Sequence, residues 1–229
     1  LENTLIFFMS DNGAEGNDRS EIGNNREWLP KAWDLSFANM GRKDSYVYYG
    51  GAWAQVSAAP FHMFKAYLSE GGTRSPLITV VPKSAARKGL ARAFTTVVDI
   101  VPTILDYAEI TPADKNQYGQ TVHALQGTTM RPYLEGQSKL VHDETFAFGW
   151  ELFGHRAIRK GDWKLLWRLE LSGQGQWKLY NLAIDPAELI DLADTQLDKL
   201  EEMKAHWQSY VEKNNIILLD AIPIGAFSY

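Results

Sequence analysis

The chain has 229 residues, of which 45% are hydrophobic and 12% aromatic, so it carries enough apolar surface for a packed core. Its formal net charge is only −5, and no run of Lys or Arg exceeds two residues, which argues against a nucleic-acid surface or a polybasic membrane anchor. No stretch approaches the roughly eighteen apolar residues of a membrane span, and the lack of cysteine in this chain excludes disulfides and thiolate metal sites without indicating a compartment.

The first predicted element is a strand at residues 4–9, TLIFFM, whose β-branched and aromatic side chains indicate burial on both faces. Such a strand needs neighbours on both sides, and no strand precedes it in the sequence. We therefore expect the chain to start inside a domain, with companion strands in a missing N-terminal part. Residues 13–45 are polar, rich in Gly and Asn and without a sustained period, so we expect a long surface excursion there.

The segment that begins at Pro60 predicts a short amphipathic piece, then a break at Gly71-Gly72, and then a second buried strand at about 76–81. Residues 94–108 carry apolar side chains at helical spacing, and Pro102 within them predicts a kink or a break. We expect this helix to pack on the sheet that contains the two strands.

Beyond a soft boundary near residue 140, the pattern changes to short, aromatic-rich segments separated by Gly or Asp, which is typical of an antiparallel meander. A helix at about 195–213 has an apolar stripe that should cover one face of that sheet. The fold class is therefore α/β: residues 1–140 form part of a mixed sheet with flanking helices, and residues 141–229 form a small α+β subdomain. The four predicted strands of the meander are residues 144–151, 154–160, 162–169 and 176–181.

The end of the first strand carries polar side chains suited to a metal ion. The run Ser10-Asp11-Asn12-Gly13 follows the strand directly, and the carboxyl ends of strands are where α/β sheets place their ligand crevices. Asp11 and Asn12 offer a carboxylate and an amide oxygen, which are hard donors that suit calcium or magnesium. Taken alone, the same residues also make an ordinary turn after a strand.

Five segments, in this order along the chain, form a combination that is specific to one family: FMSDNGAEG, FKAYLSEGGTRSPLITVVP, TTVVDIVPTILDYA, GWELFGHRAIRKGDWK and LYNLAIDPAELIDLAD. Together they resemble the C-terminal portion of a bacterial type I arylsulfatase, in the alkaline-phosphatase-like superfamily. The resemblance runs from residue 1 to about residue 213. It implies that residues 1–140 belong to the catalytic α/β domain of such an enzyme.

The resemblance also implies roles for individual residues. Asp11 and Asn12 correspond to ligands of a divalent cation, usually Ca2+, and Lys65 corresponds to a lysine that contacts the substrate sulfate, where a compact ammonium can stabilise anionic oxygen. Arg74 would tie its loop to the sheet. The implied reaction is hydrolysis of aryl sulfate esters through a formylglycine nucleophile in the missing N-terminal part. Three nearby acidic residues have no role in the family and are expected to be solvated: Glu15, Asp18 and Glu21.

The chain departs from the family because it contains no precursor of formylglycine. It has no cysteine, and none of its serines begins an S-x-P-x-R sequence. We therefore expect it to hold about half of an active site and to be inactive alone, with the missing N-terminal part and a small sulfate ester as its partners. Two alternatives stay open: a phosphonate or phosphate ester hydrolase of the same superfamily, and a non-catalytic interaction module.

Overall fold

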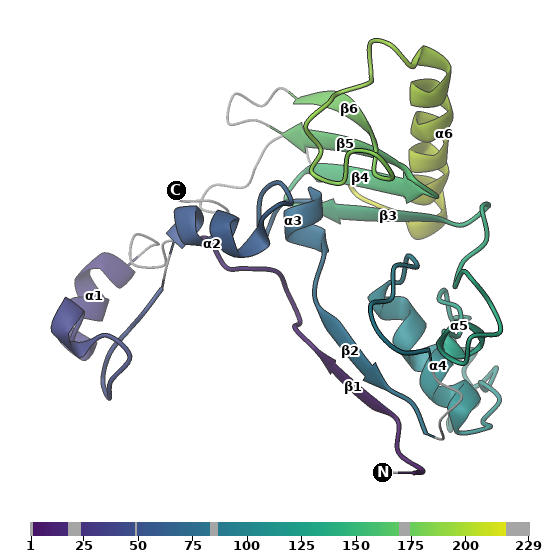
Figure 1. The fold of residues 1–229 in the computed structure, drawn as a ribbon, viewed down its shortest axis with the longest axis horizontal. Coiled ribbons are helices and arrows are strands. Elements are labelled where there is room, and N and C mark those ends of the chain that lie inside the picture. Colours follow the sequence, from purple (N-terminus) through teal and green to yellow (C-terminus); the bar gives the residue numbers. More distant parts are fainter. Residues whose placement is uncertain (1, 18–23, 49, 83–86, 170–174, 219–229) are drawn as a thin grey trace. The chain divides into compact units, whose positions relative to one another are not determined.

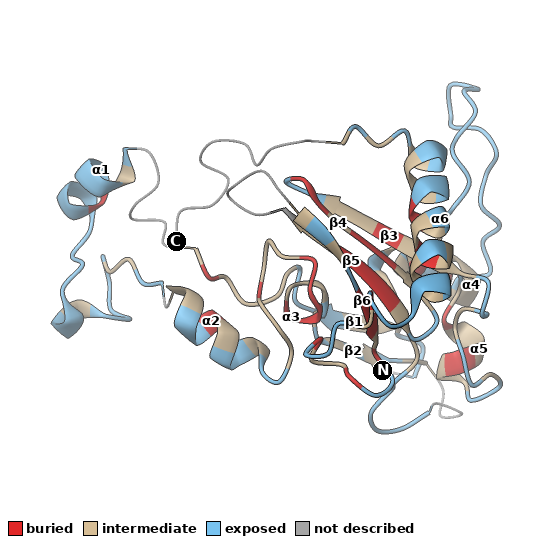
Figure 2. Ribbon diagram, turned by 90° about the horizontal axis from the view of Figure 1, so that it is seen from above, coloured by how far each residue is buried: buried red, intermediate tan, exposed pale blue. Residues whose placement is uncertain are grey.

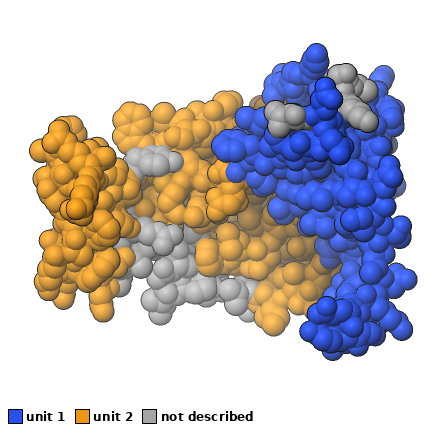
Figure 3. Space-filling view, turned by 90° about the horizontal axis from the view of Figure 1, so that it is seen from below, with its two compact units in different colours: residues 1–9, 76–146 blue, residues 10–75, 147–229 orange. Residues whose placement is uncertain are grey.

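The computed structural model describes residues 2–17, 24–48, 50–82, 87–169 and 175–218. The chain divides into two compact units (Figure 3), one made of residues 1–9 and 76–146 and the other of residues 10–75 and 147–229. The domain division at residue 140 stays a prediction. None of the described helices is both long and apolar enough to cross a membrane.

The second unit contains a four-stranded antiparallel sheet in the order β3-β4-β5-β6 (Figure 1), which confirms the predicted meander. The turn from β3 to β4 has only Phe153 and Gly154 between the paired ends, and both have positive φ angles, 53° and 85°. Two such residues give a turn whose twist matches that of the strands it joins. The strands are β3 (Ala147–Leu152), β4 (His155–Lys160), β5 (Trp163–Leu169) and β6 (Gly175–Asn181).

One face of this sheet packs against the long helix α6 (Leu197–Asn214), as the apolar stripe predicted. Leu165 in β5 lies with Met203 and Trp207 of α6 in one buried cluster, and Met203 is fully buried. The helix ends at Asn215, whose left-handed conformation (φ 51°) lets its backbone N–H bond the last turn. Much of the outer side of α6 is exposed (Figure 2).

The other face of the sheet is also buried, which the sequence did not indicate. Leu166 of β5 and Tyr180 of β6 form a second cluster with Leu68, which comes from a segment about a hundred residues earlier in the chain. Successive residues of a strand point to opposite faces, so Leu165 and Leu166 serve the two clusters separately. The segment that carries Lys65 is therefore packed on the same unit as the sheet.

Among the described residues of the second unit, four short helical elements precede the four-stranded sheet. The predicted excursion at residues 13–45 contains two of them, which its irregular pattern did not reveal. The predicted break at Gly71-Gly72 is wrong, because both glycines lie inside a single helical turn. The four elements are α1 (Asn25–Ala32), η2 (Phe37–Asn39), α2 (Gly50–Ala58) and α3 (Glu70–Thr73).

The first unit contains a two-stranded antiparallel sheet of β1 (Ile6–Met9) and β2 (Leu77–Val80), in the register Phe8↔Ile78. The predictions that the first strand is buried on both faces and that the second strand is buried are both wrong for the described chain. Phe8 is 71% exposed and Ile78 is 60% exposed, because among the described residues β1 has only β2 as a neighbour in the sheet.

The predicted helix at residues 94–108 is two elements, η3 (Val97–Asp99) and α4 (Ile100–Tyr107). Pro102 falls in the first turn of α4, where its missing N–H costs no helical hydrogen bond, so it marks the start of the helix and not a kink. The helix contacts α5 (Arg131–Leu134). The expected packing of this helix on a sheet is not found among the described elements, and Ile104 on its apolar side is 44% exposed.

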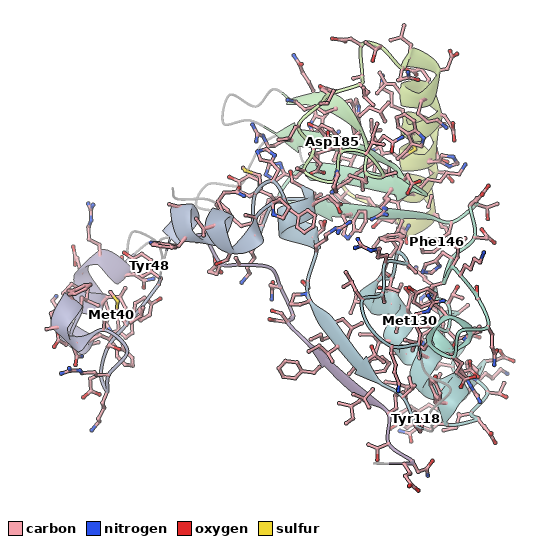
Figure 4. The ribbon with its side chains drawn as sticks, viewed as in Figure 1. Met40, Tyr48, Tyr118, Met130, Phe146 and Asp185 are labelled. Atoms are coloured by element: carbon pink, nitrogen blue, oxygen red, sulfur yellow. The ribbon has the colours of Figure 1, made fainter. Side chains whose placement is uncertain are left out.

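Buried polar contacts organise the core of this first unit. Asp99 is fully buried, and its carboxylate accepts hydrogen bonds from the backbone N–H groups of Thr96 (2.7 Å) and Thr128 (2.9 Å). The ring of His142 lies 2.9 Å from the same carboxylate. Met130, labelled in Figure 4, is buried at the start of α5, and its N–H donates to the Thr103 hydroxyl at 2.9 Å. Asp99 thus joins the helix start to two later loops.

Candidate functional site

The predicted metal ligands lie in the loop that follows β1. Asp11 is exposed and Asn12 is half-buried, and the Ser10 hydroxyl donates to the Asn12 carbonyl at 2.6 Å, which gives the loop its turn. A side chain on Gly13 would place its Cβ 3.0 Å from the Gly71 carbonyl oxygen and 3.8 Å from the backbone nitrogen of Lys65. The loop therefore passes close to the backbone of the segment that carries Lys65.

Lys65 is bound to this loop through both its backbone and its side chain. Its N–H donates to the Ala14 carbonyl at 3.0 Å, and its ammonium nitrogen lies 2.8 Å from Oε2 of Glu15. The two side chains are 33% and 29% exposed, so the ion pair is partly shielded from water. The expectation that Glu15 is a solvated loop residue is wrong, because its carboxylate pairs with Lys65. Asp18 and Glu21 lie outside the described residues.

The segment around Lys65 has an unusual backbone that several contacts hold in place. Met63 and Ala66 have positive φ angles of 63° and 78°, which L-residues adopt only when the surroundings require it. The Gln55 side chain in α2 accepts from the Met63 N–H at 2.9 Å and donates to the Phe61 carbonyl at 2.8 Å. Lys65 therefore lies between two residues with positive φ, and the Gln55 contacts hold the backbone on its N-terminal side.

The glycines of α3 allow the segment to fold back on itself. A Cβ on Gly71 would lie 2.0 Å from the Met63 carbonyl oxygen, and one on Gly72 would lie 2.0 Å from the Tyr67 carbonyl oxygen. No side chain fits at either distance. The glycines are there for close backbone approach, which explains why the predicted break is a compact turn.

The histidine nearest to Lys65 in sequence has a pKa below the ordinary histidine value. Burial lowers the pKa of His62, and the positive charges of Arg168 and Lys178 lower it further. Its backbone carbonyl accepts the Gly71 N–H at 2.9 Å. His62 therefore contributes to the packing of this loop, and Lys65 is the cation that the loop presents.

A buried ion cluster anchors the same segment to the four-stranded sheet. The fully buried ammonium of Lys164 in β5 lies 2.8 Å from Glu70 and 3.0 Å from Glu188. The Glu70 backbone N–H also donates to the Glu188 carboxylate at 2.7 Å. Arg74 completes the cluster with a 2.6 Å bond to Glu70, and its guanidinium lies 4.5 Å from the centre of the Phe61 ring. The structural role expected for Arg74 is thus exerted through Glu70.

The two carboxylates of the cluster respond differently to burial. Burial alone would raise the pKa of Glu70, but the charges and hydrogen bonds of Lys164 and Arg74 outweigh it and lower the pKa to about 2. Burial raises the pKa of Glu188, and this effect exceeds the opposing attraction of Lys164. Glu70 is therefore an anion over the whole neutral range, and burial makes Glu188 the more easily protonated of the two.

The third segment of the cluster is a turn that follows β6. The carboxylate of Asp185, labelled in Figure 4, accepts the backbone N–H groups of Leu189 and Ile190, each at 2.8 Å. These bonds fix the turn that places Glu188, which itself has a positive φ of 57°. Sequence reasoning assigned no role to Glu70, Lys164 or Glu188. Their presence in three of the five family segments was the available signal.

The donors at the end of β1 fit part of the coordination shell of a hard divalent cation. Asp11 supplies a carboxylate and Asn12 an amide oxygen, both with access to the surface. In the described part of the chain, no group of three or more His, Asp or Glu side chains is arranged to hold a metal ion. Calcium needs six to eight oxygen ligands, so these two residues could hold it only with ligands from elsewhere. The metal and sulfate roles of Asp11, Asn12 and Lys65 stay predictions.

Comparisons with known proteins agree with the resemblance seen in the sequence. The family described as N-sulphoglucosamine sulphohydrolase, C-terminal, matches residues 61–215, and the family described as sulfatase matches residues 1–110. A protein of Schizosaccharomyces pombe described as an uncharacterized sulfatase is 37% identical over 220 residues, which cover 95% of this chain and 39% of that protein. An arylsulfatase of Klebsiella aerogenes is 34% identical over 115 residues, which cover 48% of this chain and 24% of the enzyme.

The fold is also shared with solved structures. The crystal structure of Ps i-CgsB in complex with k-i-k-neocarrahexaose matches with a TM-score of 0.59 and 22% identity, over 91% of this chain and 36% of that one. This likeness supports the alkaline-phosphatase-like fold class. The chain spans well under half the length of each of these relatives. The matched family models together run from residue 1 to residue 215, and the chain therefore belongs to the sulfatase family, of which it carries a C-terminal portion.

Proposed function

We propose that this chain forms part of the active site of a sulfuric ester hydrolase. In this proposal, the oxygens of Asp11 and Asn12 bind a divalent cation, and the ammonium of Lys65 contacts the sulfate group near the leaving oxygen. The family membership supports the reaction type. The single observation that carries the site is the pairing of the Lys65 segment with the loop after β1, through the 3.0 Å bond to Ala14 and the 2.8 Å contact with Glu15.

In this proposal, the residues of this chain contribute to the reaction by electrostatic stabilisation of the transition state. A sulfate ester gains negative charge on its leaving oxygen as the S–O bond breaks, and a fixed ammonium stabilises that charge more in the transition state than in the ground state. The cation would add positive charge at the sulfate oxygens, and a formylglycine outside these 229 residues would supply the nucleophile. Lys65 suits its role because the bond from its own N–H to Ala14 and the Gln55 contact with Met63 limit where its side chain can reach.

We propose aryl sulfates as the substrate class, supported by the identity to the Klebsiella aerogenes arylsulfatase. Carbohydrate sulfates are the second candidate, because the model that matches residues 61–215 is described as an N-sulphoglucosamine sulphohydrolase. Turnover of nitrophenyl sulfate, nitrophenyl phosphate and N-sulfated glucosamine by the polypeptide translated from the whole gene separates these options. A preference for the phosphate would overturn the sulfatase proposal in favour of a phosphate ester hydrolase.

The Lys65→Ala variant tests the site itself. We expect kcat for nitrophenyl sulfate to fall about a hundredfold, as happens when one charge-stabilising group is removed. Lys43→Ala serves as the control, because Lys43 is an exposed lysine of the same unit, and it should leave kcat unchanged. Full turnover in Lys65→Ala would refute the assignment of Lys65. A non-catalytic interaction module predicts that no variant of the whole polypeptide has sulfatase activity at all.

A further inference from the structure

Glu15 is held in a defined position beside Lys65. One carboxylate oxygen, Oε1, accepts the backbone N–H of Asn17 at 3.0 Å, and the other, Oε2, lies 2.8 Å from the Lys65 ammonium. The first bond fixes the carboxylate to its own loop, so the second bond fixes the ammonium to that loop. Less than a third of the Glu15 side chain and about a third of the Lys65 side chain are exposed, so water screens this pair less than it screens an ordinary surface pair.

From this geometry we infer that Glu15 is a positioning residue for Lys65 and sets the charge selectivity of the site. The inference rests on the proposed function, in which Lys65 contacts the sulfate. A lysine has a flexible four-carbon stem, and its ammonium has three donors. Glu15 occupies one donor and leaves two for the oxygens of a substrate. Since Asp11 and Asn12 precede Glu15 in the same loop, the bond also sets the place of the ammonium relative to the predicted metal ligands.

The negative charge of Glu15 has a second consequence. A sulfate monoester carries one negative charge, whereas a phosphate monoester carries close to two above pH 7, because its second pKa is about 6. A carboxylate beside Lys65 cancels most of the lysine's charge for an approaching anion. The repulsion between the carboxylate and a substrate grows with the charge of the substrate. Glu15 therefore disfavours the phosphate more than the sulfate, at a site where both tetrahedral groups fit.

The loop itself does not depend on the Glu15 side chain. The backbone bond from Lys65 to Ala14 and the close approach of Gly13 to Gly71 do not involve the Glu15 side chain. The Lys65 backbone is also held by the Gln55 contacts on its N-terminal side. Substitution of Glu15 should therefore release the ammonium and change the local charge while the backbone stays in place.

Two variants separate position from charge, both made in the polypeptide translated from the whole gene. Glu15→Gln keeps an acceptor for the ammonium and removes the charge, whereas Glu15→Ala removes both. For nitrophenyl sulfate, we expect kcat to fall about tenfold in Glu15→Ala and clearly less in Glu15→Gln. Nitrophenyl phosphate then serves as a competitive inhibitor at pH 8. We expect the ratio of its inhibition constant to the KM of the sulfate to be about tenfold lower in Glu15→Gln than in the wild type. Glu27→Gln, an exposed glutamate of α1, is the matched control for both measurements.

The double variants decide whether Glu15 acts through Lys65. In a Lys65→Ala background, Glu15→Ala should cause no further loss of kcat. An equal tenfold loss in both backgrounds would overturn the positioning role, because Glu15 would then act on the loop and not on the ammonium. An unchanged inhibition constant for the phosphate in Glu15→Gln would overturn the charge selectivity. The proposed function fails separately, if Lys65→Ala alone retains full turnover.

Discussion

Replacing Lys164 by methionine tests how strongly the buried ion cluster holds the second unit together. Methionine has a similar length and no charge, so Lys164→Met removes the cation with little change in volume. Two carboxylates lose their partner, since Lys164 lies 2.8 Å from Glu70 and 3.0 Å from Glu188. These glutamates are 2% and 4% exposed, so water cannot replace the ammonium.

The size of the effect follows from what the buried carboxylates can do without their cation. Leaving a buried charge without its partner costs about 3–5 kcal/mol. A carboxyl can instead take up a proton, and the gap between pH 7 and the ordinary glutamate pKa of 4.5 sets that cost at about 3.4 kcal/mol. Arg74 still contacts Glu70, which limits the loss at that residue. We therefore expect Lys164→Met to lower the free energy of unfolding by about 3–4 kcal/mol at pH 7.

The same reasoning gives the direction of the pH dependence. A glutamate whose folded-state pKa is lowered to about 2 stabilises the fold above its unfolded pKa, and this contribution is lost as the pH falls from about 4.5 toward 2. Without Lys164, Glu70 no longer makes that full contribution, and both carboxyls take up protons at a higher pH. The deficit of Lys164→Met should therefore shrink as the pH falls from 7 to 4.5.

Urea unfolding of the chain at pH 7 and pH 4.5, followed by tryptophan fluorescence, to which the buried Trp207 contributes, measures both quantities. Lys160→Met is the matched control, because Lys160 lies on the neighbouring strand β4, is 25% exposed, and is 3.4 Å from Glu202. A pair of this kind contributes less than about 1 kcal/mol. If Lys164→Met unfolds within about 1 kcal/mol of the wild type at pH 7, or if its deficit is the same at both pH values, the electrostatic account of the cluster is refuted.

Three further variants follow from the packing and from the predicted metal site. Met203→Ala removes a fully buried side chain beneath the sheet and should cost about 2–5 kcal/mol in urea unfolding, whereas no loss would mean that α6 does not pack as described. Gly71→Ala would place a Cβ 2.0 Å from the Met63 carbonyl oxygen, so we expect a lower melting temperature and faster proteolysis at the 61–74 segment than in the wild type. Asp11→Ala in the polypeptide translated from the whole gene should abolish calcium binding measured by calorimetry, and unaltered affinity would remove Asp11 from the ligand set.

Local pattern was sufficient for the four-stranded sheet and α6. Short, aromatic-rich segments separated by Gly or Asp predicted the strands of the meander within a few residues, because these signals are contained in each hairpin. The apolar stripe that includes Met203 and Trp207 likewise predicted the buried side of α6. The short helices α1 and α2 were missed, since a helix of eight or nine residues with few buried side chains leaves little periodic signal.

The burial of β1 was predicted wrongly for a related reason. A run such as TLIFFM indicates that its side chains favour burial, but the sequence of the strand says nothing about whether covering elements are present beside it. In the described chain β2 is its sole strand partner, so Phe8 is exposed. The composition of a strand indicates whether its side chains favour burial. The elements that pack beside the strand determine whether those side chains are buried.

The candidate site shows where pattern reasoning fails for charged residues. Lys164 and Arg168 share a face of β5 with Leu166, and cations at alternate positions normally mark a face in contact with water. That face is instead covered by the Leu68 segment, which is possible because Glu70 and Glu188 arrive from positions 94 residues before and 24 residues after Lys164 to neutralise its charge.

Glu15 follows the same logic over a shorter separation. Within its own loop it resembles any solvated acid, and its function depends on Lys65, 50 residues later, reaching within 2.8 Å. When the partner of a carboxylate is distant in sequence, the local pattern predicts that the carboxylate is exposed to solvent. Reasoning from a single sequence therefore misses ion pairs of this kind. Glu70, Lys164 and Glu188 lie in three different family segments, and only the fold brings them together into one buried cluster.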